Sequence, residues 1–412
     1  MSELAPPPAT PHGQPPASGP PPGQPGAPPQ ARARRRIPIF VRLLFLVALA
    51  FTTLGVVESA FIVYDLFTGS LSAQRAPDLG VGIRSWTVHH ALRPGYNNPN
   101  VHTNSLGLRS PEVAIPKPAG TVRILLLGDS FTYGFLARED EVFARRLEER
   151  LRHDDRFKSV EVVNAGVLSY CPLLEYLQYR NELHILEPDL VILNFDMSDV
   201  QDHLEYSRDA KWSSAGVPLF VTEPSLRKSP SAMPELLSFQ WIARKVSGAR
   251  RRLESAAEGV PFTRDQDRYL WALDNGPDMD REARSTMAPI ADLSVLLQHH
   301  GIPLVLATYP QPWQVAADAT PFEPIRERFS IGMNKVHLND RPFQKLERFS
   351  VEHRIPFLNA TRAFREDSNP AGLFLGNDFH FSARGNDRYA EILAGYIAAH
   401  AHDGIGPQPK FF

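Results

Sequence analysis

A serine follows the first strongly apolar segment of the chain's larger, C-terminal part, at a place where its hydroxyl could react. Residues 123–128 (RILLLG) are typical of a buried strand, and the motif Gly128-Asp129-Ser130 comes at its end. In open parallel sheets, ligands bind at the carboxyl ends of the strands. A serine held there by a glycine-permitted turn could attack a substrate. The alternative is an ordinary strand-to-helix turn in which Asp129 or Ser130 caps the next helix.

A nucleophilic serine needs a base, and that base needs a group to orient it. Among 14 histidines, His380 stands out because it precedes the expected last helix and follows Asp378 by two residues. In an extended loop both side chains point the same way, so Asp378 can hold Nδ1 while Nε2 faces Ser130. The alternative is that Ser382 caps the helix while Asp378 and His380 are solvated.

Two further polar segments end apolar strands and could stabilise negative charge. Asn164-Ala165-Gly166 follows the second expected strand, and residues 194–199 (NFDMSD) end the third. Acyl transfer needs preformed hydrogen-bond donors aimed at the developing oxyanion. A glycine N–H that a ligand can approach, together with a polar side chain on the next strand, would supply them.

Taken together, these segments resemble the SGNH (GDSL-type) hydrolase superfamily, in its membrane-anchored branch, over roughly residues 122–203 and 302–400. The resemblance implies that Ser130 is the nucleophile and that its backbone N–H also serves the oxyanion hole. It implies that Gly166 is the oxyanion glycine. It further implies that Asp378 and His380 complete the triad, with the Asp-x-His spacing seen in membrane-associated and polysaccharide-modifying branches.

The third block departs from the family pattern. Where the family usually has Gly-x-Asn-Asp, this chain reads Asp196-Met197-Ser198-Asp199, so Ser198 stands at the position of the oxyanion asparagine. A hydroxyl can donate one hydrogen bond, and we expect Ser198 to complete the oxyanion hole. Asp129, Asn164 and Asp199 are expected to support the site.

A segment before the serine, Asn104-Ser105-Leu106-Gly107-Leu108-Arg109, resembles the lead-in of membrane-anchored members. Arg109 is expected either to contact the substrate or to pack on the fold.

The acids after the third strand could form a metal site or have a structural role. Oxygen ligands suit Mg²⁺ or Ca²⁺, and the candidates are Asp196, Asp199, Asp202 and His203. A spacing of three after a strand equally fits a helix start, where acids are favoured. We expect no metal and no cofactor. The single cysteine, Cys171, excludes a disulfide scaffold and is expected to be a small buried residue.

The elements that must position these residues alternate between apolar strands and amphipathic helices. This alternation predicts βαβ units and a parallel sheet covered on both faces, and the superfamily resemblance implies a three-layer α/β/α, flavodoxin-like fold. The expected strands are 123–128, 159–164, 189–195, 302–309 and 355–359. The expected helices are 139–152, 173–186, 285–299, 343–353 and 384–400.

The N-terminal part has a different composition from the body. Twelve of the 38 prolines lie in the first 30 residues, which contain little apolar surface and are expected to be disordered. We therefore expect four parts. They are a proline-rich cytoplasmic tail with a basic end (1–36), a transmembrane signal anchor (37–66), a lead-in that packs on the catalytic domain (67–120) and a hydrolase domain (121–412). Residues 204–282 do not follow the alternation of apolar strands and amphipathic helices, and we expect them to form an insertion that caps the site.

Residues 43–64 contain a single charge, Glu58, and as a helix would span about 33 Å, enough for a bilayer core. Five arginines precede this stretch, so the positive-inside rule places the N-terminus in the cytoplasm and the body on the periplasmic or outer face of the membrane. A cleaved signal peptide is disfavoured because its basic region would exceed about 35 residues. A buried helix of a soluble protein is the remaining alternative.

Charge excludes one class of function. Residues 1–42 carry a net +4, so the other 370 residues carry −6, and a mildly acidic body disfavours binding of nucleic acid. We expect a membrane-anchored serine esterase acting on an ester-bearing small molecule, lipid or glycan. The alternatives are an O-acyltransferase of envelope polysaccharide that uses the same site, and a non-catalytic envelope scaffold or binding protein.

Overall fold

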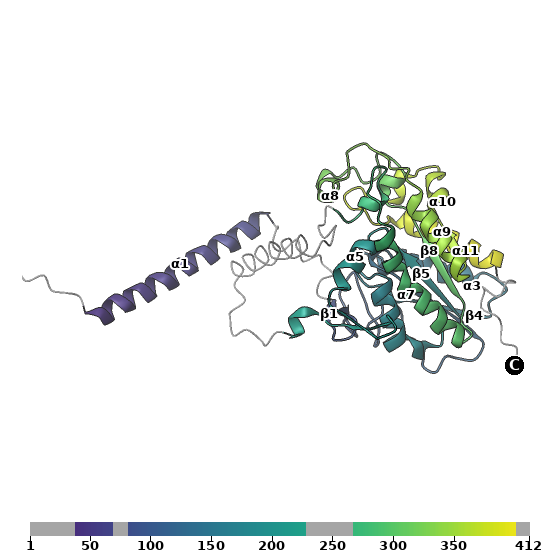
Figure 1. The fold of residues 1–412 in the computed structure, drawn as a ribbon, viewed down its shortest axis with the longest axis horizontal. Coiled ribbons are helices and arrows are strands. Elements are labelled where there is room, and N and C mark those ends of the chain that lie inside the picture. Colours follow the sequence, from purple (N-terminus) through teal and green to yellow (C-terminus); the bar gives the residue numbers. More distant parts are fainter. Residues whose placement is uncertain (1–37, 69–80, 228–266, 401–412) are drawn as a thin grey trace, which may run out of the picture. The chain divides into compact units, whose positions relative to one another are not determined.

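The computed structural model describes residues 38–68, 81–227 and 267–400. The expected tail and the middle of the expected insertion lie outside these residues. The first described element, α1 (Ile39–Thr68), is one continuous helix of 30 residues (Figure 1). Its segment Ile39–Ala60 has a mean hydropathy of 2.3 and is long and apolar enough to cross a membrane.

A five-stranded parallel sheet forms the centre of the second compact unit, as predicted. The strands are β3 (Thr121–Leu127), β4 (Ser159–Asn164), β5 (Leu190–Phe195), β8 (Leu304–Thr308) and β9 (Phe357–Asn359). Their order in the sheet is β4-β3-β5-β8-β9, with every neighbouring pair parallel. In chain order this is 2-1-3-4-5, the flavodoxin-like order, whose switch point lies between β3 and β5.

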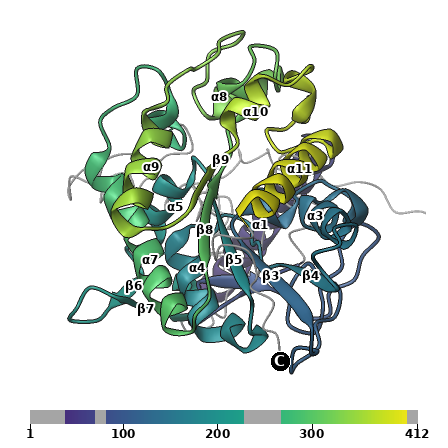
Figure 2. The same ribbon diagram turned by 90° about the vertical axis from the view of Figure 1, so that its right-hand side faces the viewer.

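Helices cover both faces of the sheet, which confirms the three-layer α/β/α fold. Alternate side chains of β3 enter opposite cores: Ile124 and Leu126 pack with α3 (Phe143–Arg152) and α11 (Ala383–His400). Leu125 and Leu127 pack on the other face, whose main helices are α4 (Pro172–Gln178), α7 (Asp280–His299) and α9 (Arg341–His353). Figure 2 shows α3 and α11 on one side of the strands and α4 and α7 on the other.

Three expected helices differ from the structure in their limits. The helix expected over 173–186 is α4 followed by a π-helical turn, η2 (Tyr179–Leu183), and a 3₁₀ turn, η3 (His184–Leu186). The helix expected over 139–152 is divided by extended Val142 into η1 (Glu139–Glu141) and α3. The helix expected from residue 285 begins at Asp280, and Pro289 lies inside it.

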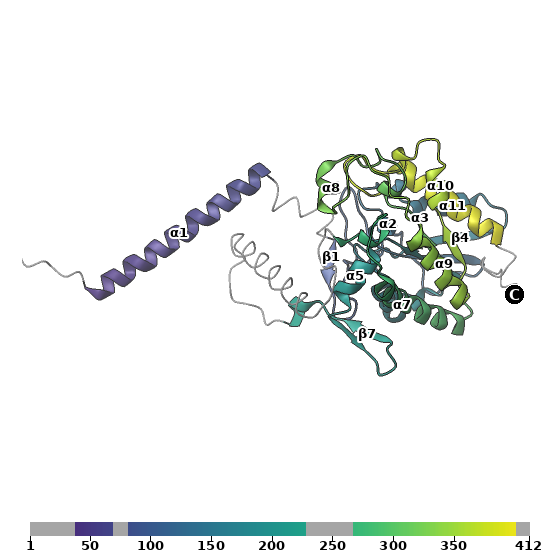
Figure 3. The same ribbon diagram turned by 45° about the horizontal axis from the view of Figure 1, so that its top comes forward.

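Two small antiparallel sheets lie outside the central one. The lead-in forms β1 (Gly82–Arg84) and β2 (His90–Leu92), and its Val88, Leu92 and Leu108 are buried in the core. A hairpin of β6 (Ala210–Trp212) and β7 (Pro218–Val221) belongs to the expected insertion and extends from the body in Figure 3. The remaining short helices are α2 (Ser130–Tyr133), α5 (Asp199–Tyr206), η4 (Pro224–Arg227), η6 (Leu270–Ala272), η7 (Pro312–Gln314), α8 (Glu323–Arg328), α10 (Thr361–Arg365) and η8 (Ala371–Leu373).

Arg109 of the lead-in packs on the fold. Its side chain is 1% exposed, and its guanidinium donates to the carbonyl oxygens of Tyr133 (3.1 Å), Gly134 (2.7 Å) and Ala137 (2.8 Å). Tyr133 and Gly134 end the short helix that begins with Ser130. The lead-in therefore fixes the far end of the turn that carries the serine.

We predict that Arg109→Met destabilises the protein by about 3 kcal/mol or more, because it removes the hydrogen bonds that Arg109 donates to the buried carbonyl oxygens of Tyr133, Gly134 and Ala137. Urea-induced unfolding of the full chain in detergent measures the loss. Arg362→Met, at an arginine whose side chain is 86% exposed, is the matched control and should unfold like the unaltered protein. An equal effect of the two substitutions would contradict this account of Arg109.

Candidate active site

Ser130 lies in a tight turn at the carboxyl end of β3. Gly128 precedes it, and a Cβ at that position would come within 2.1 Å of the Thr132 hydroxyl oxygen, so only glycine fits. The Asp129 carboxylate accepts a hydrogen bond from the Phe131 N–H at 2.9 Å and caps α2. Asp129 therefore has the capping role considered from the sequence, and Ser130 is the first residue of the helix.

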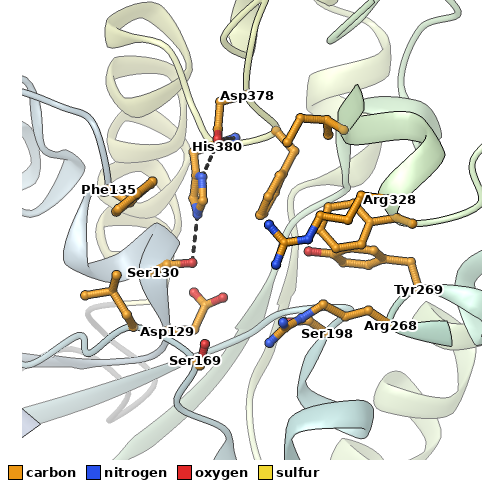
Figure 4. A pocket seen from close by; sticks show the side chains of 14 residues that line it. Asp129, Ser130, Phe135, Ser169, Ser198, Arg268, Tyr269, Arg328, Asp378 and His380 are labelled. Carbon is orange, nitrogen blue, oxygen red and sulfur yellow. Dashed lines mark hydrogen bonds and ion pairs between the residues drawn. The ribbon is translucent and has the colours of Figure 1, made fainter. Parts of the chain in front are cut away.

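A hydrogen-bonded chain joins Ser130 to His380 and Asp378 (Figure 4). His380 Nε2 is 2.8 Å from Ser130 Oγ, and His380 Nδ1 is 2.5 Å from Asp378 Oδ1. The backbone N–H of His380 also donates to that Asp378 oxygen at 3.0 Å. The loop expected before the last helix thus brings both residues to the serine, and Ser382 caps that helix as well, by accepting the N–H of Gly385 at 3.1 Å.

Aromatic side chains enclose the histidine. The His380 ring lies 4.2 Å from Phe379, 4.8 Å from Phe131 and 4.9 Å from Phe135, measured between ring centres. Burial by itself would raise the pKa of Asp378, but the hydrogen bond from His380 and the charge of its ring lower that pKa below its usual value. Asp378 is therefore ionised at neutral pH and can accept the Nδ1 proton.

A group of buried carboxyl groups lies next to the serine turn. Carboxylate oxygens of Asp129, Asp196 and Asp199 lie within 4.8 Å of one another, which is close enough to share a cation. Burial raises the pKa of Asp129 and Asp199 well above the usual value, and repulsion from a neighbouring carboxylate adds to it, from Asp196 at Asp129 and first from Glu175 at Asp199. The Tyr309 hydroxyl donates to Asp129 at 3.1 Å, and the Gln311 amide donates to Asp196. Tyr309 and Gln311 thus supply hydrogen bonds to two members of this group.

The four residues that the sequence suggested as metal ligands, Asp196, Asp199, Asp202 and His203, do not all lie around one point. His203 Nε2 lies 3.1 Å from the Ser285 hydroxyl, and Asp202 forms an ion pair with Arg268. Cys171 is fully buried, and burial raises the pKa of its thiol well above the usual value, so it is unreactive.

The assignment of Gly166 to the oxyanion hole needs correction. Its N–H donates to the Asn164 side-chain oxygen at 2.9 Å, and Gly166 does not line the pocket that contains Ser130. A Cβ at Gly166 would lie 2.3 Å from the Tyr133 nitrogen, so glycine is needed for close packing against α2. Asn164 Nδ2 donates to the Thr132 carbonyl at 2.8 Å, so both residues support the turn rather than contact a substrate.

Ser169, farther along the same loop, is better placed than Gly166. It lines the pocket and has a φ of +59°, which turns its backbone away from the ordinary extended path. Within the described parts of the chain, no hydrogen bond uses its N–H. The neighbouring Leu168 carbonyl lies 2.7 Å from His90 Nε2, so the lead-in holds this loop. A motif match could not choose among the N–H groups of one loop; a non-glycine residue at positive φ is visible only in the structure.

Ser198 lines the pocket as expected, but its donors point to carboxylates. Its N–H donates to Asp196 at 2.7 Å, and its hydroxyl donates to Asp202 at 3.3 Å. Asp199 accepts the Asp196 N–H at 3.1 Å and so fixes the loop after β5. Asp199 is thus a structural support at a strand end.

The pocket has a volume of about 200 Å³ and contains Ser130, His380 and Asp378. Sequence reasoning did not identify four further lining residues that could contact a ligand: Ser169, Arg268, Tyr269 and Arg328. Arg268 and Tyr269 belong to the expected insertion, residues 204–282. No local motif marks Arg268, because its partner Asp202 lies 66 positions away.

Several solved structures resemble this fold. One is described as a putative lipolytic protein of the G-D-S-L family from Desulfitobacterium hafniense (12% identity, TM-score 0.35), covering 66% of this chain and 98% of that chain. Another is a lipase/acylhydrolase from Enterococcus faecalis (12%, TM-score 0.38), covering 68% and 96%. A third is a variant of an acetylxylan esterase from Geobacillus stearothermophilus (13%, TM-score 0.35), covering 67% and 94%.

These structures are described as GDSL-family or esterase proteins, the superfamily that the sequence resembles. At such identities and TM-scores the likeness says nothing about the substrate or activity of this chain. No protein-family model matches the sequence. No curated protein matches it either.

Glu175, on α4, allows the effect of a buried carboxyl group on stability to be tested. It is fully buried, both of its carboxylate oxygens lack a hydrogen-bond partner among the described residues, and burial raises its pKa well above the usual value. Above pH ~4.5 the unfolded state loses this proton while the folded state retains it, so the carboxyl lowers the stability of the folded state as pH rises.

We predict that Glu175→Gln stabilises the protein by about 1–3 kcal/mol at pH 7 and has little effect near pH 4. Urea unfolding at the two pH values measures this difference. Glu149→Gln, at a glutamate whose side chain is 62% exposed, is the control and should change little at either pH. A loss of stability at pH 7 in Glu175→Gln would show that the carboxylate itself is needed, as it would be for a bound cation.

Proposed function

We propose that this chain is a serine hydrolase that cleaves ester bonds through an acyl-enzyme. The observation that carries the proposal is the continuous hydrogen-bonded chain from Ser130 through His380 to Asp378 inside a pocket. A serine is a weak nucleophile unless a base removes its proton, and the base works best when a third group fixes its tautomer. The three side chains have the geometry that these roles require.

In the proposed reaction, His380 Nε2 removes the proton of Ser130 Oγ as the oxygen attacks the ester carbonyl. Ionised Asp378 accepts the Nδ1 proton and stabilises the imidazolium that forms. The N–H groups of Ser130 and Ser169 donate to the carbonyl oxygen as it becomes negative. His380 then protonates the leaving alcohol, and water, activated by the same histidine, releases the acid.

The acceptor decides between two enzymes that share this chemistry. Water gives an esterase; a sugar hydroxyl attacking the same acyl-enzyme gives an O-acyltransferase. The substrate we propose is an ester-bearing small molecule, lipid or glycan, and the bond to be cleaved is an O-acyl ester. The pocket of about 200 Å³ is large enough for a short acyl group.

We further propose that α1 is an uncleaved signal anchor. Four arginines precede it in the sequence, a fifth, Arg42, lies in its first turn, and the acidic Asp65 lies near its end. By the positive-inside rule, the N-terminus would then be cytoplasmic and the domain that contains Ser130 extracytoplasmic. An ester of the cell envelope would be within reach of an enzyme held in this way.

We predict that a fluorophosphonate probe labels the full chain and that Ser130→Ala abolishes both labelling and turnover of nitrophenyl acetate. Only a serine activated by a base reacts with such a probe at an appreciable rate. Asp378→Asn should lower kcat by about 10³–10⁴-fold, because the imidazole loses its fixed tautomer. Gel fluorescence and initial rates measure the two effects.

Ser285→Ala is the matched control, because Ser285 also lies within hydrogen-bond distance of a histidine, His203. That histidine has no partner for Nδ1 among the described residues, and burial lowers its pKa to about 4. Ser285→Ala should therefore keep full labelling. A folded protein that is never labelled would refute the hydrolase and favour a non-catalytic binding protein.

A further inference from the structure

Position 198 does not have the asparagine that the resemblance to the SGNH superfamily implies for the oxyanion hole. Ser198 stands at that position, and both of its donors are directed at carboxylates, its N–H at Asp196 and its hydroxyl at Asp202. An oxyanion in the pocket would have to compete with a carboxylate for the hydroxyl proton. The Ser198 hydroxyl therefore already donates its proton to Asp202.

A stronger donor lines the same pocket beside Ser198. Figure 4 shows the Arg268 side chain entering the pocket from the side opposite His380, with its guanidinium group directed toward the part of the pocket where Asp129, Ser130 and Ser169 lie. The Arg268 side chain is 19% exposed, so it is largely withdrawn from water. A guanidinium in such a position interacts with a negative charge more strongly than it would at the surface.

Asp202 anchors this arginine. One terminal nitrogen of Arg268 pairs with Asp202 Oδ1, while the other oxygen of Asp202 accepts the Ser198 hydroxyl. A guanidinium has five N–H donors, and Asp202 is the acceptor recorded for Arg268 among the described residues. The pair therefore fixes the orientation of the side chain and leaves further N–H groups for a ligand.

We propose that Arg268 donates to the oxyanion of the tetrahedral intermediate, in the role that a side-chain amide at position 198 would otherwise have. The proposal rests on the proposed function. As Ser130 Oγ bonds to the ester carbon, the carbonyl π electrons move to the oxygen, which accepts hydrogen bonds from the Ser130 and Ser169 N–H groups and from Arg268. The electron pair then returns to re-form the carbonyl, and the alcohol leaves with the proton from His380.

This assignment gives Ser198 and Asp202 a connected role. Asp202 is a positioning residue that holds the guanidinium, and the Ser198 hydroxyl helps to hold the Asp202 carboxylate. The departure from the Gly-x-Asn-Asp pattern is then compensated within the pocket. A positively charged donor would stabilise the intermediate more than the ester, whose carbonyl oxygen carries only a partial charge.

The test uses the full chain and nitrophenyl acetate, an ester without a charge. Arg268→Gln is expected to lower kcat by about 10²–10³-fold, the range seen when one oxyanion donor is removed, with a much smaller change in KM. Arg268→Lys should recover part of that loss. The rate of fluorophosphonate labelling should fall in parallel, because the phosphonyl oxygen occupies the same place as the oxyanion.

Arg180→Gln is the control, because the Arg180 guanidinium is likewise held by hydrogen bonds, in its case to the carbonyl oxygens of Pro218 and Leu219, but does not line the pocket. It should retain the kcat of the unaltered chain. Circular dichroism and thermal unfolding establish that each variant is folded. If Arg268→Gln does not fold, Asp202→Asn and Arg268→Lys give the readout instead, each with kcat lowered and KM nearly unchanged.

Coupling provides a second criterion. Because Asp202 acts through Arg268, Asp202→Asn in the Arg268→Gln background should lower kcat no further, whereas independent roles would give additive losses in free energy.

Folded Arg268→Gln with an unchanged kcat on the neutral ester would overturn the proposal. A loss confined to an anionic ester, such as a nitrophenyl hemisuccinate, would also overturn it and assign Arg268 to substrate binding. Failure of the unaltered chain to label at Ser130 would instead refute the proposed hydrolase itself.

Discussion

The hydrogen bond between Ser130 Oγ and His380 Nε2 is the interaction on which the proposed chemistry depends, and it joins residues 250 positions apart. The serine is placed by the first strand of the parallel sheet and the histidine by the loop before the last helix. Packing of α11 against α3 brings these two ends of the domain together.

The surroundings of the bond combine rigidity with buried charge. Gly128 and Gly166 allow the backbone to approach the serine turn closely, and Arg109 holds the carbonyls at its other end. The carboxyl groups beside the turn are buried at a cost in stability, because their ionised forms are poorly solvated there. Such a cost is tolerated at functional sites, where perturbed pKa values cluster. The central sheet supplies the stability that offsets it.

Much of the fold and part of the site could be predicted from the sequence. The strands were predictable because short apolar runs, such as residues 124–127 and 190–193, alternate with amphipathic helices. His380 was predictable because it follows Asp378 by two residues in a loop. Gly166 was misassigned, since a motif does not show which N–H of a loop is already bonded. Arg268 was missed because its role depends on Asp202, across a long insertion, and no spacing rule links the two residues.

The central claim is that Ser130 forms a covalent acyl-enzyme, and trapping that intermediate tests it most directly. The full chain would be mixed with nitrophenyl acetate, quenched in acid within one turnover and digested for mass spectrometry. The account predicts an acetyl group on the peptide that contains Ser130, and none in Ser130→Ala. Hydrolysis without an adduct at Ser130, or an adduct on another residue that accounts for turnover, would contradict it.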